Sequence, residues 1–474
     1  MSADSSGSPA PFLAQDPDFE ASGQNAGPES IAWIHRLGSA DVKFSPGVGE
    51  MSRVKASYET WTQILRRGGP QVYGVHTGYG ADVSSVKEPA RWHENQSELL
   101  DYLRVGVGDP FLPSVVRRAL RLQAWKTAQG YSGIHPDTYL ALCELSNQEA
   151  LPKVPKHGSL GASGDLVPMA HAIAPIFDGS GPRGPRDVIG LVNTNSMMAS
   201  FAVELHSACS RVVNEAIAAT ANAALALGEI REPFEPAGHA VNPAKPHVQI
   251  AAAGVLAAQR SKRERRGWSA ECATPRSFAV LQERYSIRCS PQVLGNCMWN
   301  LESASERIVC EALSIADNPI ALGEHPWHGG HFYAAGIATA SDLMADAVAR
   351  ACELLDRQCL ILMDPVTSHG LPENLAFSGT GHTKGIHQLL SSLNQSIRAH
   401  AVPSRGLSFS CEGNNQDVVP AAMAALISLE SMLQLAQHVV RASIFVSDRA
   451  AHLRWNGSVP PGLKLEDWNA PPSA

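Results

Sequence analysis

The stretch Gly158-Ser159-Leu160-Gly161-Ala162-Ser163-Gly164-Asp165 sets a serine between small residues in a glycine-rich segment. If the Gly164 nitrogen attacks the Ala162 carbonyl, a five-membered ring closes. Loss of two waters, the second taking the Ser163 hydroxyl, then leaves an exocyclic alkene conjugated to a carbonyl, an electrophile that no ordinary side chain provides. Glycine suits position 164 because a Cβ would disfavour the strained turn and crowd the attack. The tripeptide alone is common in ordinary loops, so its context has to decide.

The wider context favours the reactive interpretation. Residues 158–170, GSLGASGDLVPMA, resemble the signature of the histidine and phenylalanine ammonia-lyase family. Met169 takes the place of a usual Leu, which is a volume-conserving change. The resemblance implies that Ala162, Ser163 and Gly164 condense autocatalytically to 4-methylideneimidazole-5-one (MIO), with no metal and no diffusible cofactor. It also implies a homotetramer whose active sites are shared between subunits.

Composition and charge narrow the class of protein. The chain has 474 residues, of which 44% are hydrophobic, and its net charge is −7, whereas a nucleic-acid partner would need a basic face. No uninterrupted apolar stretch is long enough to cross a bilayer, and the polar N-terminus lacks the pattern of a secretory signal. Nine scattered cysteines without a close pair indicate reduced thiols rather than a zinc or redox site. We therefore expect a cytoplasmic protein that binds neither nucleic acid nor membranes.

The pattern along the chain predicts four segments. Residues 1–30 and 457–474 are rich in Pro, Ser and Gly, which predicts a disordered N-terminus and a flexible tail. Residues 31–195 alternate short helical patterns with glycine-rich turns and carry the electrophile motif. Residues 196–456 are Ala-rich and predict a central bundle of long helices, so the fold class is mainly α and, by resemblance, of the ammonia-lyase and fumarase type. Apolar residues keep helical spacing in three series: Phe201, Leu205, Ala208, Val212 and Ala216; Leu343, Ala347, Ala351 and Leu354; Leu426, Leu429, Leu433, Ala436 and Val440.

A second glycine-rich loop holds a candidate base. Residues 72–80, VYGVHTGYG, resemble the family block Tyr-Gly-x-x-Thr-Gly-[Phe/Tyr]-Gly. An isolated tyrosine usually packs its ring, whereas beside an electrophile it can act as a general base. Its pKa, ordinarily about 10, would then have to be lowered by positive neighbours or by a site that stabilises an anion. The resemblance carries the base role onto Tyr73.

Gln282, Tyr285 and Arg288 follow one another at intervals of three and would share one face of a helical turn. One interpretation is an arginine fork that holds a substrate carboxylate through two parallel hydrogen bonds, and the other is a solvated face. The block that begins at Tyr285, YSIRCSPQV, resembles the family's Tyr-Ser-x-Arg-Cys-x-Pro-Gln-Val. This match favours the carboxylate-binding interpretation.

Two further blocks resemble family positions near the amino-acid head group. Asn193 corresponds to an asparagine that orients the head group, although Thr194 follows it where the family has Gly. Glu412, Asn415 and Gln416 resemble the block of the phenylalanine and tyrosine enzymes, in which the glutamate lies near the substrate amine. These residues are predicted to bind the substrate.

A block at residues 329–332, GGHF, departs from the family pattern. It resembles a segment that supports the active site and predicts Phe332 as a substrate-binding residue, but His331 replaces a usual Asn. Leu313, just before the Asp-Asn-Pro block of residues 317–319, replaces another Asn. These two departures leave a catalytically inactive helical scaffold as a further alternative.

The residues expected around the substrate ring are mixed in character. Tyr102 and Leu103 align with the family's selectivity positions, and an aromatic residue followed by Leu predicts an apolar ring pocket without the histidine that would pair an imidazole. Lys384 takes a position that is usually apolar and close to the ring. It would pair with Glu412 or another acid if it is buried, or meet a polar ring substituent, or lie on the surface.

Together these residues predict an aromatic amino acid ammonia-lyase, with L-phenylalanine converted to trans-cinnamate as the first choice and tyrosine as the second. A histidine- or ergothioneine-type substrate, with an imidazole or thione ring, is a further alternative. An aminomutase would use the same electrophile and return ammonia to the β-carbon. The sequence does not separate this rival from a lyase, because the difference lies in how long the loop that carries the base stays closed.

Overall fold

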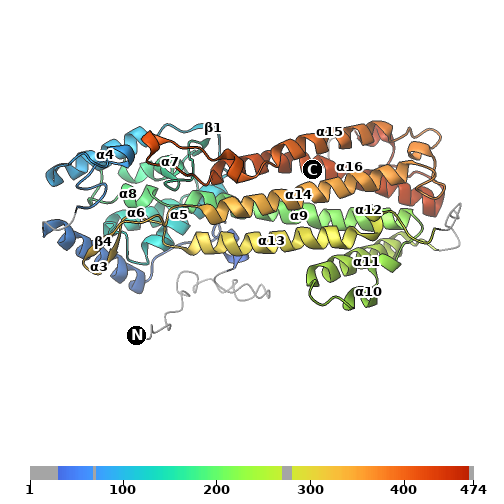
Figure 1. Cartoon of the computed structure of the whole chain (residues 1–474), viewed down its shortest axis with the longest axis horizontal. Helices are drawn as coiled ribbons and strands as arrows, with labels where there is room; N and C mark the ends of the chain where they lie inside the picture. Colours follow the sequence, from blue (N-terminus) through green and yellow to red (C-terminus); the bar gives the residue numbers. More distant parts are fainter. Residues whose placement is uncertain (1–29, 68–70, 270–279, 469–474) are drawn as a thin grey trace. The chain divides into compact units, whose positions relative to one another are not determined.

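The computed structural model describes residues 30–67, 71–269 and 280–468 (Figure 1). The described chain is mainly helical, which confirms the predicted fold class. It forms two compact units, each discontinuous in sequence. The first contains the described residues up to Leu205 together with Ala304–Ser341 and Pro403–Ile427. The second contains His206–Ser303, Asp342–Val402 and the residues from Ser428 onward.

The first unit combines short helices with two strand pairs. Strands β1 and β2 are antiparallel with an irregular register, and β3 and β4 form a regular antiparallel hairpin. Its elements are α2 (Ile31–Arg36), α3 (Val48–Arg66), α4 (Trp92–Leu103), β1 (Val107–Pro110), α5 (Pro113–Thr127), α6 (Pro136–Ser146), β2 (Pro155–His157), α7 (Leu166–Phe177), α8 (Ile189–Val192), β3 (Ile320–Leu322) and β4 (His325–Trp327).

Long helices continue through both units or belong to the second. Four of them have residues in each unit: α9 (Ser196–Ala226), α13 (Ser290–Leu313), α14 (Ala335–Met363) and α16 (Ala422–Asn456). The second unit also holds α10 (Pro236–Ala240), α11 (Pro246–Arg266), α12 (Tyr285–Arg288), α15 (Lys384–His400) and α17 (Leu465–Trp468).

The three predicted helical series lie in α9, α14 and α16, and all but two of their residues are buried; Ala208 and Leu343 are half-buried. The helices therefore form where the apolar spacing predicts them. The compact units do not follow the predicted linear division at residue 196, although α9 begins there, because four helices contribute to both units. That division stays a prediction, and residues 1–29 of the predicted disordered N-terminus lie outside the described chain.

Part of the predicted flexible tail is packed instead. In the second unit, Arg449 of α16 is fully buried and donates hydrogen bonds to backbone carbonyls of Leu375 (3.0 Å), Gly381 (2.7 Å) and Leu463 (2.7 Å). The last of these carbonyls belongs to residues 457–468, which end in α17. A buried guanidinium group needs hydrogen-bond acceptors. The Leu463 carbonyl is one of them, and this hydrogen bond attaches the tail to α16.

By length and composition, helix α16 is apolar enough to cross a membrane, and half of its most apolar stretch is buried within the protein. Core helices of globular proteins share these properties. The buried Arg449 and Arg454 donate hydrogen bonds to backbone carbonyls of neighbouring segments. This pattern is typical of a packed core helix.

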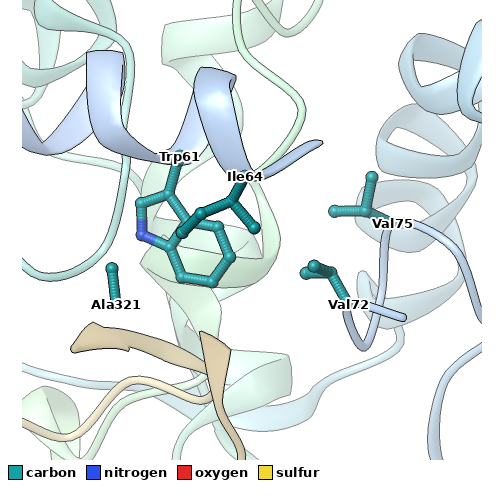
Figure 2. Close-up of a cluster of buried hydrophobic side chains, with 5 residues drawn as sticks. All are labelled: Trp61, Ile64, Val72, Val75 and Ala321. Carbon is teal, nitrogen blue, oxygen red and sulfur yellow. The ribbon is translucent and has the colours of Figure 1, made fainter. Parts of the chain in front are cut away.

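A small apolar cluster in the first unit fixes the loop that carries Tyr73. Trp61 and Ile64 of α3 pack with Ala321 of β3 and with Val72 and Val75, which flank the loop tyrosine (Figure 2). Val72 is 0% and Val75 2% exposed, so both anchors are removed from water. Burial of two valines stabilises this attachment by about 3–6 kcal/mol.

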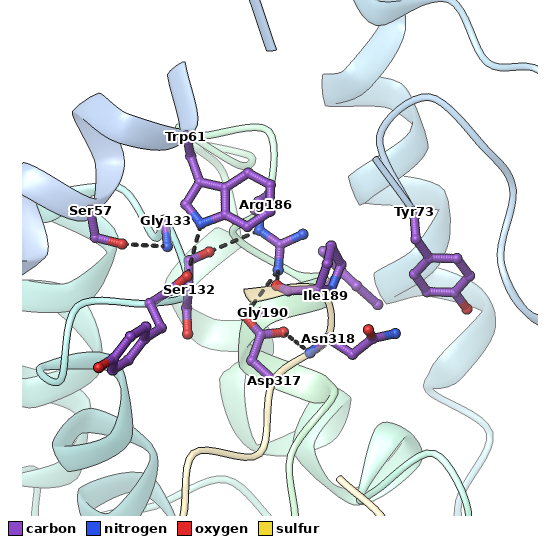
Figure 3. A network of polar contacts seen from close by, with 12 residues as sticks. Ser57, Trp61, Tyr73, Ser132, Gly133, Arg186, Ile189, Gly190, Asp317 and Asn318 are labelled. Atoms are coloured by element: carbon purple, nitrogen blue, oxygen red, sulfur yellow. Dashed lines mark hydrogen bonds and ion pairs between the residues drawn. The ribbon is translucent and has the colours of Figure 1, made fainter. Parts of the chain in front are cut away.

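Arg186 is the centre of a buried polar network beside that cluster (Figure 3). Its guanidinium lies 4.3 Å from the Trp61 ring and forms a 2.9 Å ion pair with Asp317. It also donates to the Ser132 carbonyl at 2.9 Å and the Pro319 carbonyl at 2.8 Å. The charge is neutralised by one carboxylate and solvated by carbonyls, as a buried arginine requires.

The segment that follows Asp317 reaches the tyrosine loop. The Asn318 side-chain oxygen accepts from the Gly329 amide at 2.9 Å, and His328 accepts from the Tyr73 amide at 3.2 Å. The Asp-Asn-Pro block therefore positions the loop through residues 328 and 329. In the sequence this block was only a family resemblance without an assigned structural role.

Replacing Asp317 by Asn should lower the free energy of unfolding by about 3–5 kcal/mol, because it leaves the Arg186 charge buried and uncompensated. Chemical denaturation of the purified protein measures this change. The matched control is Arg67→Gln, which breaks the exposed Arg67–Glu324 ion pair and should leave the free energy of unfolding close to that of the wild type. Equal midpoints for the two variants would contradict the structural role of Arg186.

Candidate active site

The electrophile motif folds as a tight turn directly before α7. Gly161 and Gly164 both have φ of +74°, a conformation that side chains disfavour. A Cβ on Gly164 would lie 2.2 Å from the Thr194 carbonyl oxygen, so position 164 has no room for any other residue. The Ser159 hydroxyl donates to the Gly164 carbonyl at 3.1 Å and accepts from the Gly161 amide at 3.2 Å, which closes the turn.

The turn that follows α8 lies against this motif. Asn193 is 4% exposed, and its side-chain amide donates to the Ser163 carbonyl at 2.9 Å. The Thr194 carbonyl accepts from the Asp165 amide at 2.5 Å. Thr194 does not have a positive φ, so the backbone there needs no glycine, and its hydroxyl contacts Ser196 at 2.9 Å. The departure from the family's Asn-Gly is therefore accommodated.

A second turn, at residues 411–416, reaches the same serine. Gln416 donates one hydrogen bond to the Ser163 hydroxyl at 2.8 Å and another to Glu412 at 3.0 Å. Asn415 donates to the same Glu412 carboxylate at 3.4 Å. Glu412 itself has φ of 53°, and the turn is closed by paired backbone hydrogen bonds between Cys411 and Gln416. The three predicted residues are thus held together beside the motif.

Tyr73 approaches the site from its own loop. Its hydroxyl accepts from the Gly80 amide at 2.9 Å, and its ring meets Tyr79 edge-on at 6.1 Å. Burial raises the pKa of Tyr73, the Gly80 amide lowers it by a smaller amount, and the Glu412 charge raises it further. The lowered pKa that the base role requires is therefore not supplied by its described surroundings. Substrate binding would have to supply it, through a positive amino group near Glu412.

Gln96 joins the tyrosine loop to α8, and the sequence did not single it out. It is fully buried on α4, where its side-chain oxygen accepts from the amides of Val188 (2.9 Å) and Ile189 (3.0 Å). Its side-chain nitrogen donates to the Tyr79 hydroxyl at 2.8 Å. The available signal was its position, because Gln96 lies on the same helical face as Leu99 and two further buried leucines.

A cavity of about 60 Å³ lies where these elements meet. It adjoins the motif, and a second hollow of about 330 Å³ shares Tyr79, Tyr102 and Glu412 with it. The predicted ring residues Tyr102 and Leu103 both line the smaller cavity, Tyr102 being 53% exposed and Leu103 buried. The lining of the smaller cavity consists of Tyr73, Tyr79, Gly80, Leu99, Tyr102, Leu103, Ser163, Leu166, Ile189, Asn193 and Glu412.

Four predicted site residues belong to the second unit, not to the first: Gln282, Tyr285, Arg288 and Lys384. Arg288 stacks on Tyr285, with its guanidinium 4.4 Å from the ring centre, while Tyr285 is 71% exposed. The prediction that Gln282 shares their helical face is wrong. Helix α12 begins only at Tyr285, because Arg284 is extended with ψ of 154°.

Phe332 and Lys384 are not joined to the cavity by a described contact. Phe332 is half-buried in the segment before α14 and does not line the cavity. Lys384 is the exposed first residue of α15, which agrees with the surface alternative for this chain taken alone.

The sequence also gave no indication of a group of polar residues around Lys126. Lys126 is 4% exposed, and its ammonium group contacts the side-chain oxygen of Asn195 and the Glu311 carbonyl. Burial lowers the pKa of Lys126 and raises the pKa values of Asp165 and Glu311. In the sequence, a lysine in an amphipathic helix usually means a solvated face, so no signal pointed to it.

Known proteins are similar in sequence to this chain over most of its length. The family model described as aromatic amino acid lyase matches residues 28–466. The chain belongs to the aromatic amino acid lyase family. A histidine ammonia-lyase of Desulfotalea psychrophila is 31% identical over 434 residues, covering 85% of this chain and 82% of its own length. A tyrosine 2,3-aminomutase of a Myxococcus species is 30% identical over 408 residues, covering 78% and 76% respectively.

Solved structures support the fold alone, because their sequence identities are low. A phenylalanine aminomutase of Pantoea agglomerans superposes with a TM-score of 0.80 at 23% identity, covering 94% of this chain and 92% of its own. An ergothionase of Treponema denticola gives a TM-score of 0.81 at 18% identity, covering 92% and 90%. As a member of this family, the chain is an enzyme of the carbon–nitrogen lyase type whose substrate is a free amino acid.

Replacing Gln96 by Leu should lower the free energy of unfolding by about 1–3 kcal/mol, because two buried backbone amides lose their acceptor. Gln63→Leu, at an exposed position of α3, is the matched control and should change stability by less than about 0.5 kcal/mol. Urea denaturation of both variants measures the difference. A Gln96 variant as stable as the control would show that this amide does not hold the two segments together.

Proposed function

We propose that this protein is an ammonia-lyase that acts on an aromatic L-amino acid, with L-phenylalanine as the first substrate, through an MIO electrophile made from Ala162, Ser163 and Gly164. One observation carries the proposal. Side-chain amides of Asn193 and Gln416 converge on Ser163, at its carbonyl and its hydroxyl. Hydrogen-bond donors at a carbonyl that must accept electron density are the arrangement expected of an electrophilic site.

The residues present fit the condensed group. Gly164 sits where a Cβ would collide with Thr194, and its positive φ bends the chain back toward Ala162. When formed, the group supplies an electron-poor alkene conjugated to a carbonyl. The Asn193 amide lies at hydrogen-bond distance from the Ser163 oxygen, so it would stabilise negative charge there.

The chain's own residues would divide the remaining work. Tyr73 would remove the β-proton of the substrate, and it lines the same cavity as Ser163. Glu412 would hold the substrate amine. Its negative charge raises the pKa of Tyr73, and a bound ammonium group beside Glu412 would counteract this effect and favour the Tyr73 phenolate. Whether the amine or the ring engages the electrophile stays open.

The second-unit residues would complete the site from another subunit. Arg288 would bind the substrate carboxylate, with Gln282 and Tyr285 beside the head group and Asn193, Phe332, Asn415 and Gln416 supporting it. The half-buried Arg288 leaves its Nε without a partner in the described chain, which suits a group that awaits an anion. We propose a cytoplasmic homotetramer with shared active sites, as in the family that the sequence resembles.

The side chains around the cavity favour an apolar ring. Leu99, Leu103, Leu166 and Ile189 supply aliphatic surface, and none of the described residues that line the cavity is a histidine. These four side chains offer an imidazole no hydrogen-bond partner, whereas they suit a phenyl ring, which favours phenylalanine over histidine. The Tyr102 hydroxyl and, across subunits, Lys384 are the polar groups that would instead favour tyrosine or a thione-bearing ring.

An aromatic 2,3-aminomutase is the second candidate, favoured by the 30% identity to a relative that bears that name. Incubation with L-phenylalanine followed by chiral analysis separates the two functions. Cinnamate without β-phenylalanine supports the lyase, whereas accumulation of β-phenylalanine identifies the mutase.

Ser163→Ala should abolish both turnover and the mass deficit of the mature protein. The condensation releases two waters, so the wild-type chain should weigh about 36 Da less than its sequence mass. Intact-mass spectrometry and the ultraviolet absorbance of the conjugated product measure the two effects. A variant that keeps wild-type turnover would falsify the proposed mechanism.

The ascending limb of kcat/KM plotted against pH should shift to lower pH in Glu412→Gln. Removing the negative charge favours the Tyr73 phenolate, so the pKa of the free base falls and the active form appears at lower pH. The overall kcat/KM should fall as well, because the amine loses its partner. Glu98→Gln, at a carboxylate that lines the neighbouring hollow, should leave the limb in place. An unmoved limb in the Glu412 variant would exclude Tyr73 as the titrating base.

A further inference from the structure

Lys126 is a buried cation that the proposed function does not use. It lies in the last turn of α5, where a positive charge suits the helix dipole, and it is 4% exposed. Its ammonium group donates to the Asn195 side-chain oxygen and, at 3.2 Å, to the Glu311 carbonyl. Burial of an ammonium group is costly unless it is paired and hydrogen-bonded, so its presence here needs a reason.

The partners of Lys126 form a closed polar unit. Asn195 is 0% exposed, and its side-chain nitrogen donates to the Glu311 carboxylate at 2.7 Å. The other Glu311 oxygen accepts from the Gly336 amide at 2.8 Å. Lysine and glutamate therefore hold the two ends of one asparagine amide, which fixes that amide in a single orientation.

The same helix holds the turn at a second point, one turn earlier. Gln123 donates to the Gly190 carbonyl at 3.0 Å and accepts from the Ser196 hydroxyl at 3.0 Å. Together with the contact from Lys126 to Asn195, these bonds attach α5 to residues 190–196 at both ends. Asn193 and Thr194 lie between these attachment points, so the contacts with α5 fix their position.

The middle of this turn is the part that meets the electrophile motif. Asn193 donates to the Ser163 carbonyl, and the Thr194 carbonyl accepts from the Asp165 amide at 2.5 Å. The Thr194 backbone also fills the space beside Gly164. A displacement of the turn would therefore release the bend at residues 163–165.

We propose that Lys126 is a positioning residue for ring closure: by holding Asn195 it keeps Asn193 and Thr194 against the Ser163–Gly164 peptide in the bent form that closes. This inference rests on the proposed function. In the closure the Gly164 nitrogen bonds to the Ala162 carbonyl carbon. The carbonyl oxygen leaves as water with the amide hydrogens of Gly164 and Ser163, and the Ser163 hydroxyl then leaves as a second water with its Cα hydrogen. No oxidant is needed.

Lys126 is not a catalytic residue in this scheme. It does not line the cavity that contains Tyr73 and Ser163, so it acts through Asn195 and the turn. Its loss should therefore slow maturation of the chain rather than change the affinity of mature protein for substrate.

The test is a time course of intact mass after pulsed synthesis of the full-length protein. Lys126→Met keeps the length and removes the charge, and it should acquire the two-water deficit at least about ten-fold more slowly than wild type, since small misplacements of reacting groups cost rates of this order. The fraction that does mature should keep the wild-type KM.

Lys262→Met is the matched control. Lys262 is half-buried and forms an ion pair with Asp448 in the second unit, so its loss should destabilise the protein without slowing maturation. The double variant Lys126→Met/Glu311→Gln removes the Lys126 and Glu311 charges together, so it keeps the test valid if the single variant does not fold. Slow maturation of the double variant supports positioning.

Three results would overturn the inference alone, and the first two are wild-type maturation of Lys126→Met and wild-type maturation of the double variant, while wild type shows the deficit. Equal slowing in Lys262→Met at equal stability would do the same, because the effect would then be general. A wild-type protein that never loses two waters would instead overturn the proposed function together with this inference.

Discussion

The fold depends on a close approach between two stretches of backbone, at Gly164 and Thr194. A side chain at position 164 would lie 2.2 Å from the Thr194 carbonyl oxygen, so the bend of the motif and the turn after α8 determine each other. Asn193 and the Asp165 amide add hydrogen bonds on either side of that contact. The site is therefore prearranged by backbone packing, and polar side chains refine it.

Each loop that reaches this contact is anchored in the interior by a different kind of interaction. Val72 and Val75 hold the tyrosine loop through apolar burial, and Gln96 ties it to α8 through an amide. Arg186 supports the same region through a buried ion pair, and α5 grips the turn at residues 190–196. Functional residues on loops thus owe their positions to buried groups in neighbouring helices.

Sequence could predict the features that are local or strongly periodic. The long helices follow from apolar spacing, and the motif residues follow from short blocks such as the one around Ser163. The roles of Gln96 and Lys126 could not be predicted, because a single polar residue on a helix normally faces water and only tertiary contacts reveal its burial. Gln282 was misplaced because an extended Arg284 starts α12 later than its three-residue spacing suggested. Long-range pairs such as Arg186 with Asp317 have no signal in one sequence.

The most direct test of the central claim is a high-resolution crystal structure of the wild-type protein at residues 162–164. The account predicts continuous density for a planar five-membered ring with an exocyclic methylidene carbon, flanked by the Asn193 and Gln416 amides. An open, unmodified Ala-Ser-Gly peptide in protein that turns over an aromatic amino acid would contradict it.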